Sequence, residues 1–147
     1  MCKYNFFLFK DLPSAWLCGV RVRDLNDKKC IISVRHNWFN SNPFKSLYWA
    51  VQGMASELAT GLAIIDFANK KKLKISMLVI SNESKFLKKA KGLIRFECDQ
   101  VKAVKKTLSS LSKDKTTDKI KLKSTGYDES GDVVSEFIYE WSLKLKE

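Results

Sequence analysis

The chain has 147 residues, of which 45% are hydrophobic and 29% are charged, and its formal net charge is +11. This length fits one domain, residues 1–147, which can bury a core without disulfides or a metal ion. The composition excludes collagen, solenoid repeats and a disordered chain. The positive charge favours an acidic partner, such as nucleic acid, anionic lipid, an acidic carrier protein or a phosphorylated cofactor.

The cysteines and the histidine do not indicate a metal site or a disulfide framework. The four cysteines are far apart and form no C-x-x-C pair, and His36 is the one histidine. The apolar start at residues 6–9 is too short for a secretory signal and is followed by Lys10 and Asp11. We therefore expect reduced thiols, a cytoplasmic location, and neither a metal nor a cofactor.

The first third of the chain predicts a short helix and then two strands. Residues 2–18 are aromatic, weakly helical and interrupted by Pro13. Residues 20–25 and 29–36 are typical of a strand pair joined by a tight turn. The second of these strands alternates with a period of two, which places three apolar side chains on one face: Cys30, Ile32 and Val34.

A long apolar segment over about residues 46–68 predicts a helix that is buried in the core. Asn42 can cap its start with Pro43 in the first turn, and Ser46 is an alternative cap. One face of the segment is apolar over most of its length, so we expect the helix to be covered. Carboxylates within the segment, Glu57 among them, argue against membrane insertion.

The remainder of the chain predicts four more strands and one surface helix. Residues 75–80 and 94–98 are expected to form strands, and Asp99 is expected to cap the helix that follows. Residues 119–127 and 133–145 predict a hairpin, because apolar side chains alternate with lysines in the first and share one face in the second. The sequence thus predicts an α+β domain, a long antiparallel sheet with one buried helix.

Glu57 lies on this helix within one or two turns of four small side chains, Ala50, Gly53, Thr60 and Gly61. Each glycine costs about 1 kcal/mol relative to alanine, which predicts close approach by a ligand, a strand or a partner helix. A buried carboxylate in such a channel has a raised pKa and can act as a base or a nucleophile. Alternatively, the small residues serve only packing, and Glu57 pairs with a basic side chain or reaches solvent.

The segment NPFKSLYWAVQGMASELATG, residues 42–61, resembles the central-helix region of hotdog thioesterases, in particular the uncharacterised DUF4442 branch. Residues 12–20, 85–92 and 131–141 resemble the entry segment, the strand-to-strand passage and the final strand of that branch. The resemblance extends over nearly the whole chain. It implies a hotdog fold, in which the sheet wraps round the central helix.

In the phenylacetyl-CoA type of hotdog thioesterase, a loop Asn is followed by His-Gly-Gly and then by an Asp or Glu on the helix. Asn42 and Glu57 match the Asn and the acid at the same separation, whereas Tyr48, Trp49 and Ala50 replace His-Gly-Gly. The resemblance implies that Glu57 activates water or attacks the thioester carbonyl and that Asn42 orients it. The Ala50 amide would then face the oxyanion, with the Trp49 ring beside it.

The resemblance also implies a homodimer or a dimer of dimers with its ligand groove at the subunit interface. The expected ligand is an acyl-CoA or acyl-carrier thioester, and Tyr48 and the small helix residues are expected to line its channel. Lys88, Lys89 and Lys91 follow the passage that borders the groove and are expected to contact the phosphates of coenzyme A. The expected function is hydrolysis of the thioester, and the alternative is a hotdog protein that binds it without turnover.

Two other functions lack support in the sequence. Aromatic side chains do not alternate with the lysine clusters, so a surface that stacks on nucleic acid is not indicated. His36 has no G-x-S-x-G turn to pair with, so a Ser-His-Asp triad is not indicated either.

Overall fold

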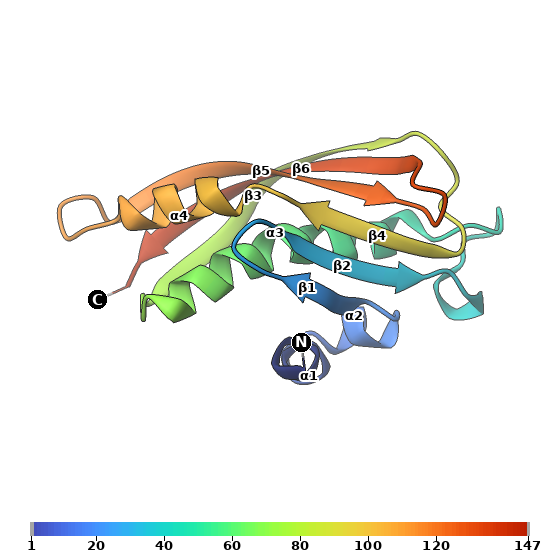
Figure 1. Ribbon diagram of the computed structural model, residues 1–147, viewed down its shortest axis with the longest axis horizontal. Coiled ribbons are helices and arrows are strands. Elements are labelled where there is room, and N and C mark those ends of the chain that lie inside the picture. The colour runs from blue at the N-terminus through green and yellow to red at the C-terminus, as the bar shows by residue number, and fades with distance from the viewer. Residues whose placement is uncertain (1, 147) are drawn as a thin grey trace.

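The computed structural model describes residues 2–146, and in this range it has a six-stranded antiparallel sheet with the order β1-β2-β4-β5-β6-β3. The strands are β1 (Arg21–Leu25), β2 (Cys30–Arg35), β3 (Ile75–Phe86), β4 (Leu93–Cys98), β5 (Thr117–Tyr127) and β6 (Val133–Leu145). The sheet curves round the long helix α3 (Trp49–Lys70) (Figure 1). The predicted α+β class, with one buried central helix, is confirmed.

The inner face of the sheet is built from the alternating apolar side chains that the sequence predicts. In the β2–β4 ladder, Cys30 pairs with Cys98 and Ile32 pairs with Phe96. All four side chains are fully buried, as is Val34. Side chains two residues apart on a strand share one face, so this face packs against α3 while the intervening residues lie on the other.

The predicted C-terminal hairpin is also confirmed, and its first strand begins slightly earlier than expected. Ile120 pairs with Trp141 and Leu122 with Tyr139 across β5 and β6. In the connecting turn, the Asp128 carboxylate accepts hydrogen bonds from two backbone amides, both at 3.0 Å. Such local bonds fix the turn and therefore the register of the two strands.

Helix α3 begins at Trp49, so the prediction that Asn42 or Ser46 caps it, with Pro43 in its first turn, is wrong. Asn42 instead closes a separate turn, in which its side-chain oxygen accepts from the amides of Phe44 and Ser46. The amides of the next two residues are drawn into long-range bonds, to the carbonyl groups of Ala90 and Asn40. These tertiary bonds hold the backbone extended until Tyr48, which is the N-cap residue.

The predicted surface helix forms as α4 (Val101–Ser109), and it packs against α3 and β5. Val101, Val104 and Leu108 are buried. The prediction that Asp99 caps this helix is wrong, because Gln100 is the N-cap residue and makes no side-chain capping bond. The Gln100 side chain instead accepts from the Lys123 amide of β5 at 2.6 Å.

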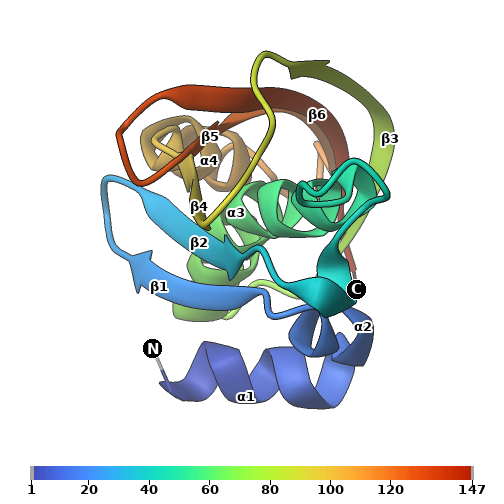
Figure 2. The ribbon, with the colours of Figure 1, turned by 90° about the vertical axis from the view of Figure 1, so that its right-hand side faces the viewer.

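The N-terminal segment forms two helices, α1 (Cys2–Asp11) and α2 (Pro13–Leu17), where the sequence predicts one. Helix α1 lies below β1 and α3, on the side that the sheet leaves open (Figure 2). The side chain of Asn5 bonds both the amide and the carbonyl of Val22, at 2.9 and 3.1 Å, and so occupies the outer edge of β1. No helix in residues 2–146 is both long enough and apolar enough to cross a membrane.

Candidate active site

Helix α3 has one partly open stripe, and Glu57 lies in the middle of it. Gly53, Glu57, Gly61 and Ile65 recur every four residues on this stripe. A Cβ atom added at Gly61 would lie 3.2 Å from the ring of Trp141 and 3.4 Å from Oε1 of Glu57. The carboxylate therefore lies beside the small Gly61 and the indole of β6, as the predicted close approach requires.

The carboxylate of Glu57 makes no hydrogen bond or ion pair with any residue in the described range 2–146. It is half-buried, and burial raises its pKa from 4.5 to about 7. The physical cause is the loss of water around the charged form, with no cation to compensate. Of the two alternatives, pairing with a basic side chain does not occur within the described chain.

Two aromatic side chains of β6 form the wall next to Glu57 and are fixed to α3 by hydrogen bonds. The hydroxyl groups of Tyr139 and Ser56 are 2.6 Å apart, and Tyr139 also donates to the carbonyl of Gly53 at 3.2 Å. Burial, with a small contribution from Glu57, raises the pKa of Tyr139 to about 12. The phenol therefore stays protonated and acts as a neutral donor.

Trp141 is fixed in the same manner. Its indole Nε1–H donates to the Thr60 hydroxyl at 3.0 Å, and that hydroxyl donates to the carbonyl of Glu57 at 2.8 Å. Thr60 is fully buried. Its role is thus to position Trp141, because its hydroxyl accepts from the indole and donates to the helix backbone.

A pocket of about 360 Å³ opens at the N-terminal end of α3, between the turn at Asn42 and the segment that follows β3. It is lined by Asn42, Ser46, Leu47, Trp49, Gln52 and residues 86–90. Three predicted site residues meet here, Asn42, Lys88 and Lys89, but Glu57 is not in the lining. Within one protomer, the two predicted catalytic residues do not share a cavity.

The side chain of Asn42 is held rigidly at this pocket. Its oxygen accepts from two backbone amides of its own turn, and its Nδ2 donates to the Ser46 hydroxyl at 3.0 Å. A carboxamide nitrogen carries two hydrogens, and the second N–H has no acceptor among residues 2–146, so it can donate to a ligand.

Gln52 is a pocket residue that the sequence reasoning did not single out. It is almost fully buried, and its amide group bridges the Leu47 carbonyl at 3.3 Å and the Ser135 hydroxyl at 2.8 Å. The sequence does contain a signal for it, because a glutamine on an otherwise apolar helix face needs hydrogen-bond partners when it is buried. Which strand supplies those partners depends on the tertiary structure.

The three predicted phosphate-binding lysines differ in their surroundings. Lys88 forms ion pairs with Asp128 at 2.6 Å and Asp132 at 2.7 Å, and the carboxylates raise its pKa. Lys89 and Lys91 are exposed and make no ion pair with any residue between 2 and 146. An anionic ligand would therefore meet free positive charge at Lys89 and Lys91, whereas Lys88 is already neutralised.

The first turn of α3 presents unused backbone donors. Within residues 2–146, the amides of Trp49 and Ala50 have no hydrogen-bond acceptor, as is usual for the first residues of a helix. The rings of Tyr48 and Trp49 are exposed beside them and contact each other edge to face. The amides can thus stabilise negative charge, and the two rings limit the approach to them.

The described residues contain no group of three or more histidine, cysteine and acidic side chains that could hold a metal ion. Cys30 and Cys98 are buried, and burial raises the pKa of each thiol. Neither thiol faces the pocket at Asn42.

No protein-family model matches the chain, and no curated protein matches its sequence. Solved structures do resemble its backbone over almost the whole length. A protein of unknown function from Pseudomonas aeruginosa, named as a probable thioesterase, is 19% identical with a TM-score of 0.83, and the match covers 99% of this chain and 97% of that one. The fold is the hotdog fold.

Two further structures support this assignment. A protein of unknown function from Chlorobaculum tepidum has a TM-score of 0.84 at 14% identity, over 98% of this chain and 93% of that one. A thioesterase from Staphylococcus aureus has a TM-score of 0.70 at 13% identity, over 90% and 98% of the two chains. At these identities the likeness establishes the fold, and the chemistry has to be argued from the residues.

Proposed function

We propose that this protein hydrolyses acyl thioesters, carried by coenzyme A or an acyl carrier protein, with Glu57 as the catalytic carboxylate. The observation that carries the proposal is the state of Glu57 on the open stripe of α3. It is desolvated and unpaired within the described chain, and its pKa is about 7. A carboxylate that serves only packing or solubility needs none of these properties.

A group with a pKa near 7 is well suited to general base catalysis at neutral pH. In the proposed reaction, Glu57 takes a proton from water while the water oxygen attacks the thioester carbonyl carbon. The resulting oxyanion accepts hydrogen bonds from the free amides at the start of α3 and from Asn42. The carbon–sulfur bond then breaks, and the thiolate leaves with the proton that Glu57 received. The alternative route, direct attack by Glu57, forms an anhydride that water then hydrolyses.

The spacing of two substituted residues in one structural neighbour supports this choice of residues. The structure of the Staphylococcus aureus thioesterase is known for variants in which a glutamate or a glutamine is replaced by alanine. These two positions are fifteen residues apart, which is also the separation of Glu57 and Asn42. The equal separation supports the choice of Asn42 and Glu57 as a pair.

A second copy of the chain is part of the proposal. The β3 edge of the sheet is unpaired within residues 2–146, and Leu78 and Ile80 are exposed along it. The opposite edge, at β1, is occupied by the side chain of Asn5. A second copy that pairs along β3 would satisfy the free backbone groups. It would also bring the pocket at Asn42 of one protomer towards Glu57 of the other.

The test compares Glu57→Gln with wild type on a panel of acyl-CoA substrates of increasing chain length, with released thiol as the readout. We expect kcat to fall by at least 100-fold, in line with the contribution of a general base. Asp114→Asn removes the same charge from an exposed loop and should leave kcat unchanged. In the wild type, kcat should rise as pH increases through about 7, because only the ionised carboxylate accepts a proton. Full activity of Glu57→Gln would contradict the proposal.

The rings of Tyr48 and Trp49 favour a second candidate function, binding of an acyl thioester without turnover. They stand beside the helix amides, and the His-Gly-Gly pattern has a histidine in place of Tyr48 and a small glycine in place of Trp49. Ligand-induced thermal stabilisation with no thiol release from any substrate would support this function. Turnover that Glu57→Gln abolishes would exclude it.

A further inference from the structure

Exposed apolar side chains form three groups on the surface of the described chain. One group lies beside the free edge of β3, and a second surrounds the pocket at Asn42. The third has no residue in the pocket lining and has no role in the proposed reaction. It consists of Phe6, Phe9, Leu12, Leu17, Trp38 and Phe39 on α1, α2 and the short 3-10 helix η1 (Trp38–Asn40). We call this group the N-terminal apolar surface.

The three helices that carry the N-terminal apolar surface are neighbours, because α1 contacts α2 and the end of α2 contacts η1. The rings of Phe9 on α1 and Trp16 on α2 lie 5.0 Å apart, edge to face. Asn40 of η1 donates to the carbonyl of Cys18, at the end of α2, at 3.0 Å. The views in Figures 1 and 2 agree that α1 and α2 lie at the lower limit of the molecule.

Helix α1 shows why this surface needs an explanation. Its inward residue Leu8 is fully buried, which suffices to attach the helix to the core. Phe6 and Phe9 point away from the core and are 65% and 54% exposed, and Trp38 on η1 is 91% exposed. Exposed apolar side chains on the outward face of a surface helix indicate that this face binds a partner.

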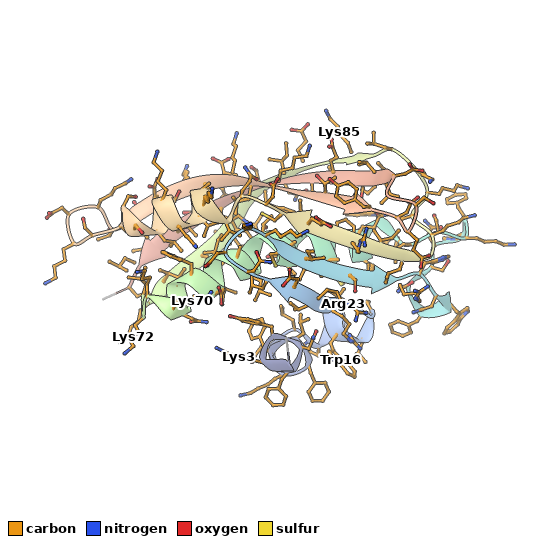
Figure 3. The ribbon with its side chains drawn as sticks, in the orientation of Figure 1. Lys3, Trp16, Arg23, Lys70, Lys72 and Lys85 are labelled. Carbon is orange, nitrogen blue, oxygen red and sulfur yellow. The ribbon has the colours of Figure 1, made fainter. Side chains whose placement is uncertain are left out.

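The charges around the surface indicate what covers it. Lys3 and Lys10 flank the two phenylalanines on α1, and Asp11 is the one acidic residue of these three helices. Figure 3 shows Lys3 and Lys72 on the lower side of the molecule together with Trp16, opposite Lys85 on the convex side of the sheet. Two copies joined through this surface would bring lysines together, in a chain of net charge +11. An anionic bilayer instead offers hydrocarbon for the rings and phosphate for the lysines.

We propose that the N-terminal apolar surface binds the interface of an anionic phospholipid bilayer, with the rings of α1 and η1 inserted between the headgroups. The contact is peripheral and reversible, since it uses a few aromatic side chains and a few charges. It positions the protein where acyl chains are concentrated, but it does not depend on thioester hydrolysis. The two proposals can therefore fail independently.

The test is co-sedimentation of the full chain with large unilamellar vesicles. One set is phosphatidylcholine alone, and the other contains equal parts of phosphatidylcholine and phosphatidylserine. We expect wild type to sediment with the second set, with an affinity that falls as salt is added. Phe6→Ser/Trp38→Ser removes two exposed rings that contact no other ring and should weaken binding at least tenfold. Lys3→Glu/Lys10→Glu should weaken it similarly.

The matched control for charge is Lys85→Glu/Lys121→Glu. It makes the same change in net charge, but on strands β3 and β5 in place of helix α1. It should bind vesicles clearly better than Lys3→Glu/Lys10→Glu. Equal weakening by the two charge reversals would mean attraction by net charge alone and would overturn the proposal. The proposal would also be overturned if the wild-type protein did not bind the vesicles, or if Phe6→Ser/Trp38→Ser bound them as tightly as wild type does. A lower oligomer mass for Phe6→Ser/Trp38→Ser in light scattering would overturn it too, because the surface would then join copies of the chain.

Discussion

Within residues 2–146, polar side chains on α3 are hydrogen-bonded on the face against β6, whereas Glu57 on the open stripe is not. On the face against β6, the polar groups of Gln52, Ser56 and Thr60 are buried, and each is hydrogen-bonded to a strand side chain. On the open stripe, Glu57 is half-buried and has no partner within residues 2–146. One helix thus carries a satisfied structural set and an unsatisfied group whose pKa is raised.

This contrast separates polar residues that stabilise the fold from Glu57, which is available for chemistry. Buried polar groups in stable proteins are almost always hydrogen-bonded, so the face against β6 follows the rule. A desolvated carboxylate without a partner reduces stability, and such groups concentrate at functional sites. The four predictions below test the difference, from the largest expected effect to the smallest.

Leu62→Ala should cause the largest loss of stability, because it opens a cavity in the buried core against α3. Leu62 is fully buried. Replacing a buried leucine by alanine lowers the free energy of unfolding by about 2–5 kcal/mol. Urea denaturation followed by circular dichroism measures this loss. Ile65→Ala on the open stripe should lose clearly less, and an equal loss would show that both faces are equally packed.

Glu57 should make stability depend on pH. In the unfolded chain its carboxyl group has the ordinary pKa of 4.5, and in the folded protein burial raises that pKa to about 7. The folded protein therefore binds the proton more tightly, so this group favours folding below pH 4.5 and loses that contribution as pH rises through 7. At about 1.4 kcal/mol per unit of pKa, discounted for partial exposure, the difference is about 2–3 kcal/mol.

The measurement is urea denaturation of wild type and Glu57→Gln at pH 4.5 and at pH 8. Glutamine cannot ionise, so it does not lose stability in this way. From pH 4.5 to pH 8 the free energy of unfolding of the variant, relative to that of wild type, should therefore rise by about 2–3 kcal/mol. A difference that does not change with pH would mean that Glu57 is normally solvated in the folded protein.

Tyr139→Phe should remove the hydroxyl that bonds Ser56 and the Gly53 carbonyl, and keep the ring. The Ser56 hydroxyl would still donate to the Gly53 carbonyl at 3.0 Å, so it would not be left without a partner. We expect the free energy of unfolding to fall by about 1 kcal/mol. Tyr127→Phe is the control, since that hydroxyl has no hydrogen bond within residues 2–146. Equal losses would show that the Ser56–Tyr139 bond contributes nothing measurable.

The two helix glycines should respond differently to alanine. A Cβ atom at Gly53 meets nothing within 4 Å, so Gly53→Ala should raise the free energy of unfolding by about 0.5–1 kcal/mol. At Gly61 the Cβ atom would press on Trp141 and on Glu57, so Gly61→Ala should gain little or no stability. Thermal unfolding of both variants tests the difference. A gain at Gly61 as large as at Gly53 would show that the Trp141 ring moves freely.

The elements whose existence was predicted correctly are those with strong local patterns. The alternation of Cys30, Ile32 and Val34 gave a strand with its buried face, and all three side chains are buried. The alternation over residues 119–127 and 133–145 predicted the hairpin, and its turn is local too, because the Asp128 side chain bonds amides only two and four residues away. These interactions lie within a few residues, so the sequence contains them directly.

The errors concern positions where a distant segment competes with a local preference. Asn42 and Ser46 are good caps, but α3 starts at Trp49 because Ala90 and Asn40 accept the amides of residues 47 and 48. Asp99 precedes α4, yet Gln100 is the N-cap residue and its side chain bonds to β5. Local propensity is worth about 1 kcal/mol at a cap, which a few tertiary hydrogen bonds exceed.

By itself, the sequence determined that a long helix is buried in an antiparallel sheet and that Glu57 lies on it among small residues. Helical periodicity and side-chain size are local properties, so they can be read from the chain. Only the tertiary structure decided that no described cation reaches Glu57, that Lys88 is neutralised by Asp128 and Asp132, and that Asn42 lies in a pocket without Glu57. Charge pairing and burial depend on which distant segments meet, and these set the pKa of Glu57.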